Sequence, residues 1–139
     1  MEQYEKDVIN ARENKLDQRF ANSIIEHARI LTKEIIFDAN KKVSILSDSF
    51  NEFFYSKLEE NIENFLKKDN ENIFELIVSN QQKENKLIQR FQKDFPTQFQ
   101  VKFISEDKFP TDNDTKERVN YIVNDNNAFR YEYSDKNIQ

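Results

Sequence analysis

The residues best placed to do chemistry lie in the polar turn Ser47-Asp48-Ser49 and at Asn51. The turn follows an apolar run and precedes a run with helical spacing. Open α/β sheets place ligands where a strand's carboxyl end meets a helix amino end, whose free N–H groups can hold an anion. The simpler interpretation is a capping box, in which Ser49 and Glu52 bond to each other's exposed backbone N–H. We therefore treat Ser47, Asp48, Ser49 and Asn51 as a hypothetical ligand-binding turn.

The other reactive side chains form no intact catalytic motif. The chain has no cysteine and a single histidine, His27, which excludes a disulfide framework, a thiolate metal site and a multi-histidine site. It also has no glycine, and phosphate-cradling loops normally need one for positive φ and close approach to the anion. An acidic cluster lies at 106–117, without the glycine and distal glutamate of an EF-hand loop. We expect no metal and no cofactor.

Charge and composition restrict the partners. Of the 139 residues, 34% are charged and 37% hydrophobic, and the net charge is −5 with both signs interspersed. Non-specific nucleic-acid binding needs a net basic face, so this balance argues against a nucleic-acid partner, although a local basic patch is compatible with it. No stretch approaches the ~18 apolar residues of a membrane span, and the charged first residues lack the apolar segment of a secretion signal. We expect a cytoplasmic protein without a membrane partner.

Hydrophobic patterning predicts the elements that would position the turn. A short apolar run, an amphipathic run and a nearly continuous apolar run predict a strand, a crossover helix and a buried parallel strand. A further helix, which Asn80 would cap, and an alternating strand continue the pattern. These five segments are 43–47, 50–68, 73–79, 81–94 and 99–104. The fold class is therefore α/β, with a mixed sheet that starts as parallel βαβαβ.

The two ends of the chain complete this fold class. Two short runs at 119–123 and 128–133 predict an antiparallel hairpin, with asparagines in its turn in place of glycine. Residues 2 to about 38 predict a long N-terminal helix, or two helices broken near Asn14. Its first half is too poor in apolar residues to persist alone in water, so we expect it to pack on a partner chain or to fray. We divide the chain into a helical extension at 1–20 and an α/β domain at 21–139.

The element order and one segment resemble half of a phospholipase-D-like domain. That segment, 118–129, reads Arg-Val-Asn-Tyr-Ile-Val-Asn-Asp-Asn-Asn-Ala-Phe. In catalytic members the hairpin carries a His, a Lys two residues on and an Asp five after that, which fall here on Arg118, Asn120 and Asp125. Only Asp125 matches, and a hairpin-turn role explains it more simply. Arginine stays protonated and cannot replace the nucleophilic histidine, so the resemblance implies a domain without that chemistry.

The resemblance also implies a function. Non-catalytic domains of this shape occur in TrmB-like transcription regulators, where a coiled coil precedes the domain; without a winged-helix segment, that likeness implies no DNA binding here. We predict a non-catalytic regulatory or assembly module acting through protein–protein association. Catalytic members pair two halves around one site, so the expected partner is a second copy or another protein. The alternatives are a divergent phosphodiesterase or nuclease half that needs a second half, and a sensor domain whose small-molecule effector binds the turn at 47–51.

Overall fold

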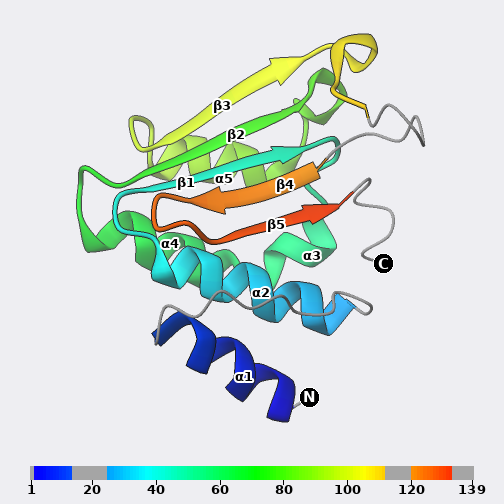
Figure 1. Cartoon of the computed structure of the whole chain (residues 1–139). Coiled ribbons are helices and arrows are strands. Elements are labelled where there is room, and N and C mark those ends of the chain that lie inside the picture. Colours follow the sequence, from blue (N-terminus) through cyan, green and yellow to red (C-terminus); the bar gives the residue numbers. More distant parts are fainter. Residues whose placement is uncertain (1, 14–24, 112–119, 133–139) are drawn as a thin grey trace.

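A five-stranded mixed sheet forms the centre of the molecule (Figure 1). The computed structural model describes residues 2–13, 25–111 and 120–132. The sheet has the order β3-β2-β1-β4-β5, in which β1, β2 and β3 are parallel while β4 and β5 pair antiparallel. The strands are β1 (Lys42–Ser47), β2 (Ile73–Ser79), β3 (Phe99–Ile104), β4 (Asn120–Asn124) and β5 (Phe129–Glu132). The predicted fold class, with its parallel start and antiparallel hairpin, is confirmed.

The described α-helices all lie on one side of the sheet (Figure 1). Because the chain steps from β1 to β2 to β3 in one direction, right-handed crossovers bring the connecting helices to the same face. The helices are α1 (Glu2–Glu13), α2 (Ile25–Asp38), α3 (Glu52–Ser56), α4 (Glu59–Lys68) and α5 (Lys86–Asp94), with 3-10 turns η1 (Asn80–Gln82) and η2 (Glu106–Lys108). Within the described ranges, no helix is long and apolar enough to cross a membrane.

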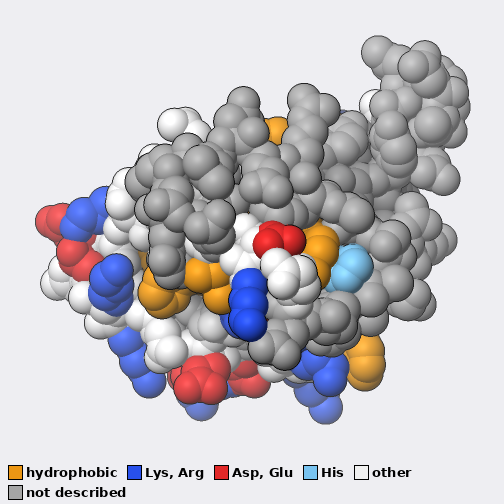
Figure 2. All heavy atoms as spheres, turned by 60° about the horizontal axis from the view of Figure 1, so that its bottom comes forward, with side chains coloured by type: hydrophobic (Ala, Val, Ile, Leu, Met, Phe, Trp, Pro, Cys, Tyr) orange, Lys and Arg blue, Asp and Glu red, His pale blue; other side chains and the backbone are white. Residues whose placement is uncertain are grey.

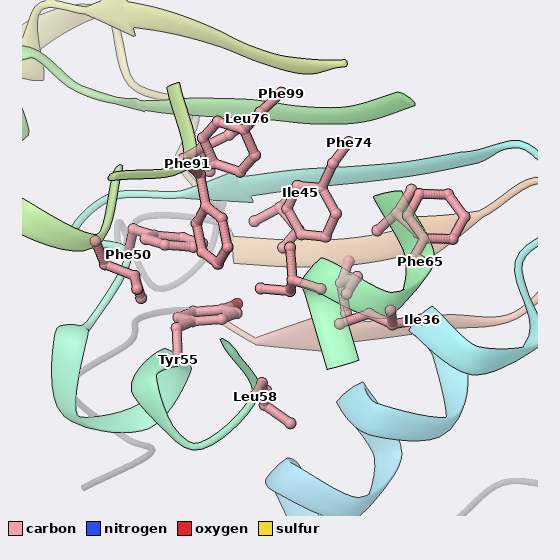
Figure 3. Packing of buried hydrophobic residues seen from close by; sticks show 14 of the residues in the cluster. Ile36, Ile45, Phe50, Tyr55, Leu58, Phe65, Phe74, Leu76, Phe91 and Phe99 are labelled. Carbon is pink, nitrogen blue, oxygen red and sulfur yellow. The ribbon is translucent and has the colours of Figure 1, made fainter. Parts of the chain in front are cut away.

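The core fills the space between the sheet and the helices (Figure 3). Alternate strand residues point into it, and the inward side chains of β2 and β4, such as Phe74 and Ile122, are almost fully buried. Aromatic rings from separate elements meet there: the ring centroids of Phe74 and Phe99 are 5.5 Å apart, and those of Phe91 and Phe99 are 5.1 Å apart. The phenylalanine-rich composition thus supplies the core itself.

The N-terminal helix lies on its own chain. α1 (Glu2–Glu13) packs along α2, and the predicted break near Asn14 lies outside the described residues. The ring of Tyr4 stacks on His27 at 3.8 Å between centroids, the ammonium of Lys33 bonds to Glu5 at 2.7 Å, and Val8 is buried. The expectation that this segment would need a partner chain or fray is therefore wrong for α1. The division at 1–20 and 21–139 stays a prediction.

The start of the first crossover differs from the predicted capping box. Asn51 caps α3, because its side-chain oxygen accepts a hydrogen bond from the Phe54 N–H at 3.0 Å. Glu52 instead accepts the Lys86 N–H, at the start of α5. Phe50 is fully buried with a φ of 44°, so the chain turns inward before the helix can begin. Because the Phe50 ring is buried, the cap lies at Asn51, two residues after the predicted Ser49.

The predicted helices are also shorter than expected. The run to Lys68 is divided into α3 and α4, and Leu58, fully buried, lies between them. After β2, the Ser79 hydroxyl accepts the Gln81 N–H and begins η1, so Asn80 caps nothing. α5 begins only after Asn85, whose side-chain oxygen accepts two N–H groups of its first turn. In both crossovers a buried side chain overrides the local helix signal.

Candidate functional site

The hypothetical ligand-binding turn lies at the carboxyl end of β1, where the parallel part of the sheet meets the antiparallel part. Ser47 and Asp48 are buried. The Ser47 hydroxyl accepts the Phe50 N–H at 2.8 Å, and the Asp48 N–H donates to the Asn120 side-chain oxygen at 2.9 Å. These two hydrogen bonds fix the backbone of the turn, and Ser49 is half-buried beside them. Ligand binding by Ser47, Asp48, Ser49 and Asn51 stays a prediction.

The degenerate phospholipase-D-like motif is not gathered into one place. Asn120 begins β4, while Asp125 follows its last residue, at the opposite end of the strand. Arg118 lies outside the described residues. The two carboxylate oxygens of Asp125 accept the backbone N–H groups of Asn40 and Lys41, each at 2.8 Å. Asp125 therefore ties the hairpin to the chain entering β1, a structural role at the far end of the sheet from the turn at 47–51.

Replacing Asp125 by alanine should lower the free energy of unfolding by about 1–2 kcal/mol, because two backbone donors lose their acceptor. Urea unfolding followed by circular dichroism measures this change. Asp107→Ala, which removes an exposed carboxylate from η2, is the matched control and should change stability by less than about 0.5 kcal/mol. Equal effects of the two substitutions would contradict the structural role of Asp125.

Several of the described lysines are already paired with a carboxylate. Lys41 bonds to Asp69, and that bond raises the pKa of Lys41 above its usual value and lowers that of Asp69. Lys42 lies 3.6 Å from Glu75. Within the described ranges, the lysines without a carboxylate partner are Lys57, Lys68, Lys83, Lys86, Lys93, Lys102 and Lys108. Three of these seven are in one short segment, the approach to α5 and the helix itself.

We call Lys83, Lys86 and Lys93 the α5 lysine line. The inner side of α5 is fixed by Leu87, Ile88 and Phe91, which are buried in the core. Lys86 and Lys93 are seven residues apart, two turns of helix and roughly 10 Å along the axis, so both point to solvent on the same side. Arg90 flanks the line and is tied to Glu59, Glu63 and Asp94. The three lysines of the line have no carboxylate partner, although Glu84 lies between Lys83 and Lys86 in the sequence and Asp94 follows Lys93.

Charge is distributed differently on the side where α1 and α2 come forward. Figure 2 shows lysine, arginine and acidic side chains intermixed there, with no area of a single sign among the coloured side chains. A small hollow of about 140 Å³ lies between α2 and α4, lined by Ile36, Phe37, Ala39, Asn61, Asn64, Phe65 and Lys68. Nowhere in the described part of the chain do three or more His, Asp or Glu side chains gather as metal ligands would.

The second face of the sheet is not covered by any described helix (Figure 1). By strand alternation and register, one row across it contains Lys102, Ile77, Leu46 and Tyr121, on β3, β2, β1 and β4. Phe129 of β5 points to the same side and is 71% exposed. We call this surface the open sheet face. It has the exposed Phe129 and Lys102 on its two edge strands, and Leu46, at its centre, is buried.

Comparison with known proteins shows a likeness in fold to a solved structure. No protein-family model matches the chain, and no curated protein matches it. Among solved structures it is similar to TrmBL2, described as an archaeal chromatin protein that shows a novel mode of DNA binding. The TM-score is 0.51 at 12% sequence identity, over 97% of this chain and 53% of TrmBL2. The likeness shows a common fold, and the chain spans about half of TrmBL2's length.

This finding corrects the functional prediction made from sequence. The neighbour is a chromatin protein whose structure shows DNA binding, so a regulatory or assembly module acting through protein–protein association, as a homodimer or with a partner protein, is contradicted. The argument against a nucleic-acid partner is contradicted by the same neighbour, which is described as binding DNA. That argument used only the net charge of the whole chain. Kinship with phospholipase-D-like domains stays a prediction. What is shown is that this chain folds like about half of TrmBL2.

Proposed function

We propose that this chain is a DNA-binding domain of a chromatin-associated protein, and that the α5 lysine line contacts the phosphates of duplex DNA. Two independent observations support the proposal. The fold is similar to that of TrmBL2 over nearly the whole chain. The described structure also concentrates unpaired lysines on Lys83, Lys86 and Lys93. In the cell this function would place the protein with the DNA, in the cytoplasm or nucleoid.

The physical reason is counterion release. Lysines that neutralise DNA phosphates displace condensed cations, and this term supplies nearly all of sequence-independent binding. Lysines already paired with a carboxylate would have to give up that partner first, so unpaired lysines are the effective ones. α5 is anchored by its apolar side, which holds Lys86 and Lys93 on a rigid element with no carboxylate between them. Binding of this kind fixes the protein on the DNA backbone without reading base sequence.

The test is the affinity for a fluorescein-labelled 20-base-pair duplex, measured by fluorescence anisotropy at low salt. The wild-type chain should bind, and Lys86→Ala with Lys93→Ala should weaken binding by about 2- to 30-fold, since each exposed ion pair is worth roughly 0.2–1 kcal/mol. Both lysines are exposed, so the double variant should fold normally. The loss should be the same for duplexes of unrelated sequence.

The matched control removes the same number of unpaired lysines elsewhere. Lys68 ends α4 and Lys108 lies in η2, and both are exposed. The double variant Lys68→Ala with Lys108→Ala changes net charge by the same amount and should bind within about twofold of the wild type. Absence of wild-type binding would sink the proposed function. Equal losses in the two double variants would sink the assignment to α5.

A further inference from the structure

In β5 an aromatic side chain faces outward and a charged side chain faces the core, the opposite of the usual pattern for a strand with one buried face. Phe129 points outward and is 71% exposed, whereas Arg130 points inward, is 8% exposed and lies with its guanidinium 5.7 Å from the Phe54 ring centroid. A one-residue slip in register would bury the phenylalanine and expose the arginine. The ladder with β4 holds the observed register through four residue pairs. The fold therefore keeps a large aromatic ring on the open sheet face.

The neighbours of Phe129 suit a flat, negatively charged aromatic ligand. Phe129 pairs with Val123, and Tyr121 is the next outward residue on β4, so the two rings are diagonal neighbours about 7–8 Å apart at their backbones. Lys102, exposed and without a carboxylate partner, lies across the sheet on β3. Of the two lysines of this face, Lys42 lies 3.6 Å from Glu75, and Lys102 has no carboxylate partner. The carboxylate of Glu106 lies against the outward Ser79 at the end of β2.

We propose that the open sheet face binds single-stranded nucleic acid, with unpaired bases stacking on Tyr121 and Phe129 and the phosphate backbone running toward Lys102. Aromatic side chains on an open sheet are a recurring platform for single strands, because every base has a π-face that can stack. A duplex keeps its bases stacked inside the helix and offers this face no ring to bind. The proposal rests on the proposed function only for the class of ligand; its residues lie on the opposite side of the sheet from α5.

The test uses the absence of tryptophan from the chain. Phe129→Trp places a single indole at the exposed position, so its fluorescence reports stacking directly. Oligodeoxyuridylate and oligouridylate should each quench it, and because these two strands differ only in the 2′-hydroxyl, their affinities show which sugar is preferred. A blunt duplex of equal nucleotide number should leave the fluorescence nearly unchanged. Quenching by the duplex as strong as by the single strands would overturn the proposal.

Alanine substitutions supply a readout independent of fluorescence. By anisotropy with labelled oligothymidylate, Phe129→Ala should weaken binding about 5- to 150-fold, the range expected for loss of one stacking ring. Phe53→Ala is the matched control, because Phe53 is 65% exposed on α3 in the helix layer, and it should bind as the wild type does. Binding unchanged in Phe129→Ala would refute the stacking site. The Lys86/Lys93 double variant separates the two proposals: it should lose duplex affinity and keep single-strand quenching in the Phe129→Trp background.

Discussion

Replacing Phe54 by alanine should lower the free energy of unfolding by about 3–5 kcal/mol, while the same change at Phe53 should cost less than about 0.5 kcal/mol. Phe54 is 1% exposed and Phe53 is 65% exposed, although they are neighbours of one residue type in one helix. The Phe54 ring packs edge-on against Tyr55 at 4.9 Å between centroids and lies under the guanidinium of Arg130. Its removal leaves a cavity beside a buried cation, which loses its aromatic contact.

Urea or thermal unfolding of the two variants measures this difference directly. Because helix propensity and composition change equally in both, their difference isolates burial. A Phe54→Leu variant, which keeps much of the volume, should recover part of the loss. Similar destabilisation by Phe53→Ala and Phe54→Ala would contradict the placement of α3 against the core.

Replacing Asn124 by alanine should lower the free energy of unfolding by about 2–4 kcal/mol, because this buried amide has three backbone partners. Its NH2 group donates to the Ile35 carbonyl at 2.9 Å, and its oxygen accepts the N–H groups of Asn126 and Ala128 at 2.8 and 3.0 Å. One side chain thus joins α2 to the hairpin and shapes the turn. The substitution leaves one buried and two partly buried backbone groups without this partner, which is costlier than losing an exposed bond.

The control for Asn124 is Asn64→Ala, at an exposed position on α4, which should leave stability within about 0.5 kcal/mol. Amide exchange adds a local readout: the β4–β5 hairpin should exchange faster in Asn124→Ala than the β1–β2 ladder does. A loss below about 1 kcal/mol, with unchanged hairpin exchange, would contradict the role given to this amide.

Patterns that act over a few residues predicted the elements well. The continuous apolar run of β2 and the alternation of β3 gave strands at 73–79 and 99–104, and both are observed at these bounds. The asparagine-rich turn was also predicted correctly, and Asn127 adopts a φ of 68° where glycine would be usual. Each of these signals depends on the period of the chain or on the conformational freedom of one residue, which the sequence displays directly.

Features that depend on contacts distant in sequence could not be predicted. The sequence offers many residues able to cap a helix, and the choice of Asn51 and Asn85 depends on where Phe50 is buried, since Asn85 also donates to the Phe50 carbonyl at 3.1 Å. Gln98 likewise donates to three carbonyls between Leu66 and Asn72, about 30 residues away. In an asparagine-rich sequence, an asparagine of an exposed loop cannot be distinguished from a buried asparagine whose amide joins two elements.

The candidate interfaces could be predicted from the sequence only in part. The spacing of Lys83, Lys86 and Lys93 is visible in the sequence, but the net charge of −5 predicts no nucleic-acid partner. Which lysines are already paired, as Lys41 and Lys42 are, needs coordinates. The outward position of Phe129 follows from alternation in the hairpin, yet that this face is free of described helices follows only from the strand order.

The salt dependence of duplex DNA binding tests the central claim most directly. If Lys83, Lys86 and Lys93 neutralise phosphates, a plot of log K against log salt for the wild type should have a slope of about −2 to −3, and removing Lys86 and Lys93 should reduce its magnitude by about 2. Identical slopes for the two proteins, or no wild-type binding even at low salt, would contradict the account.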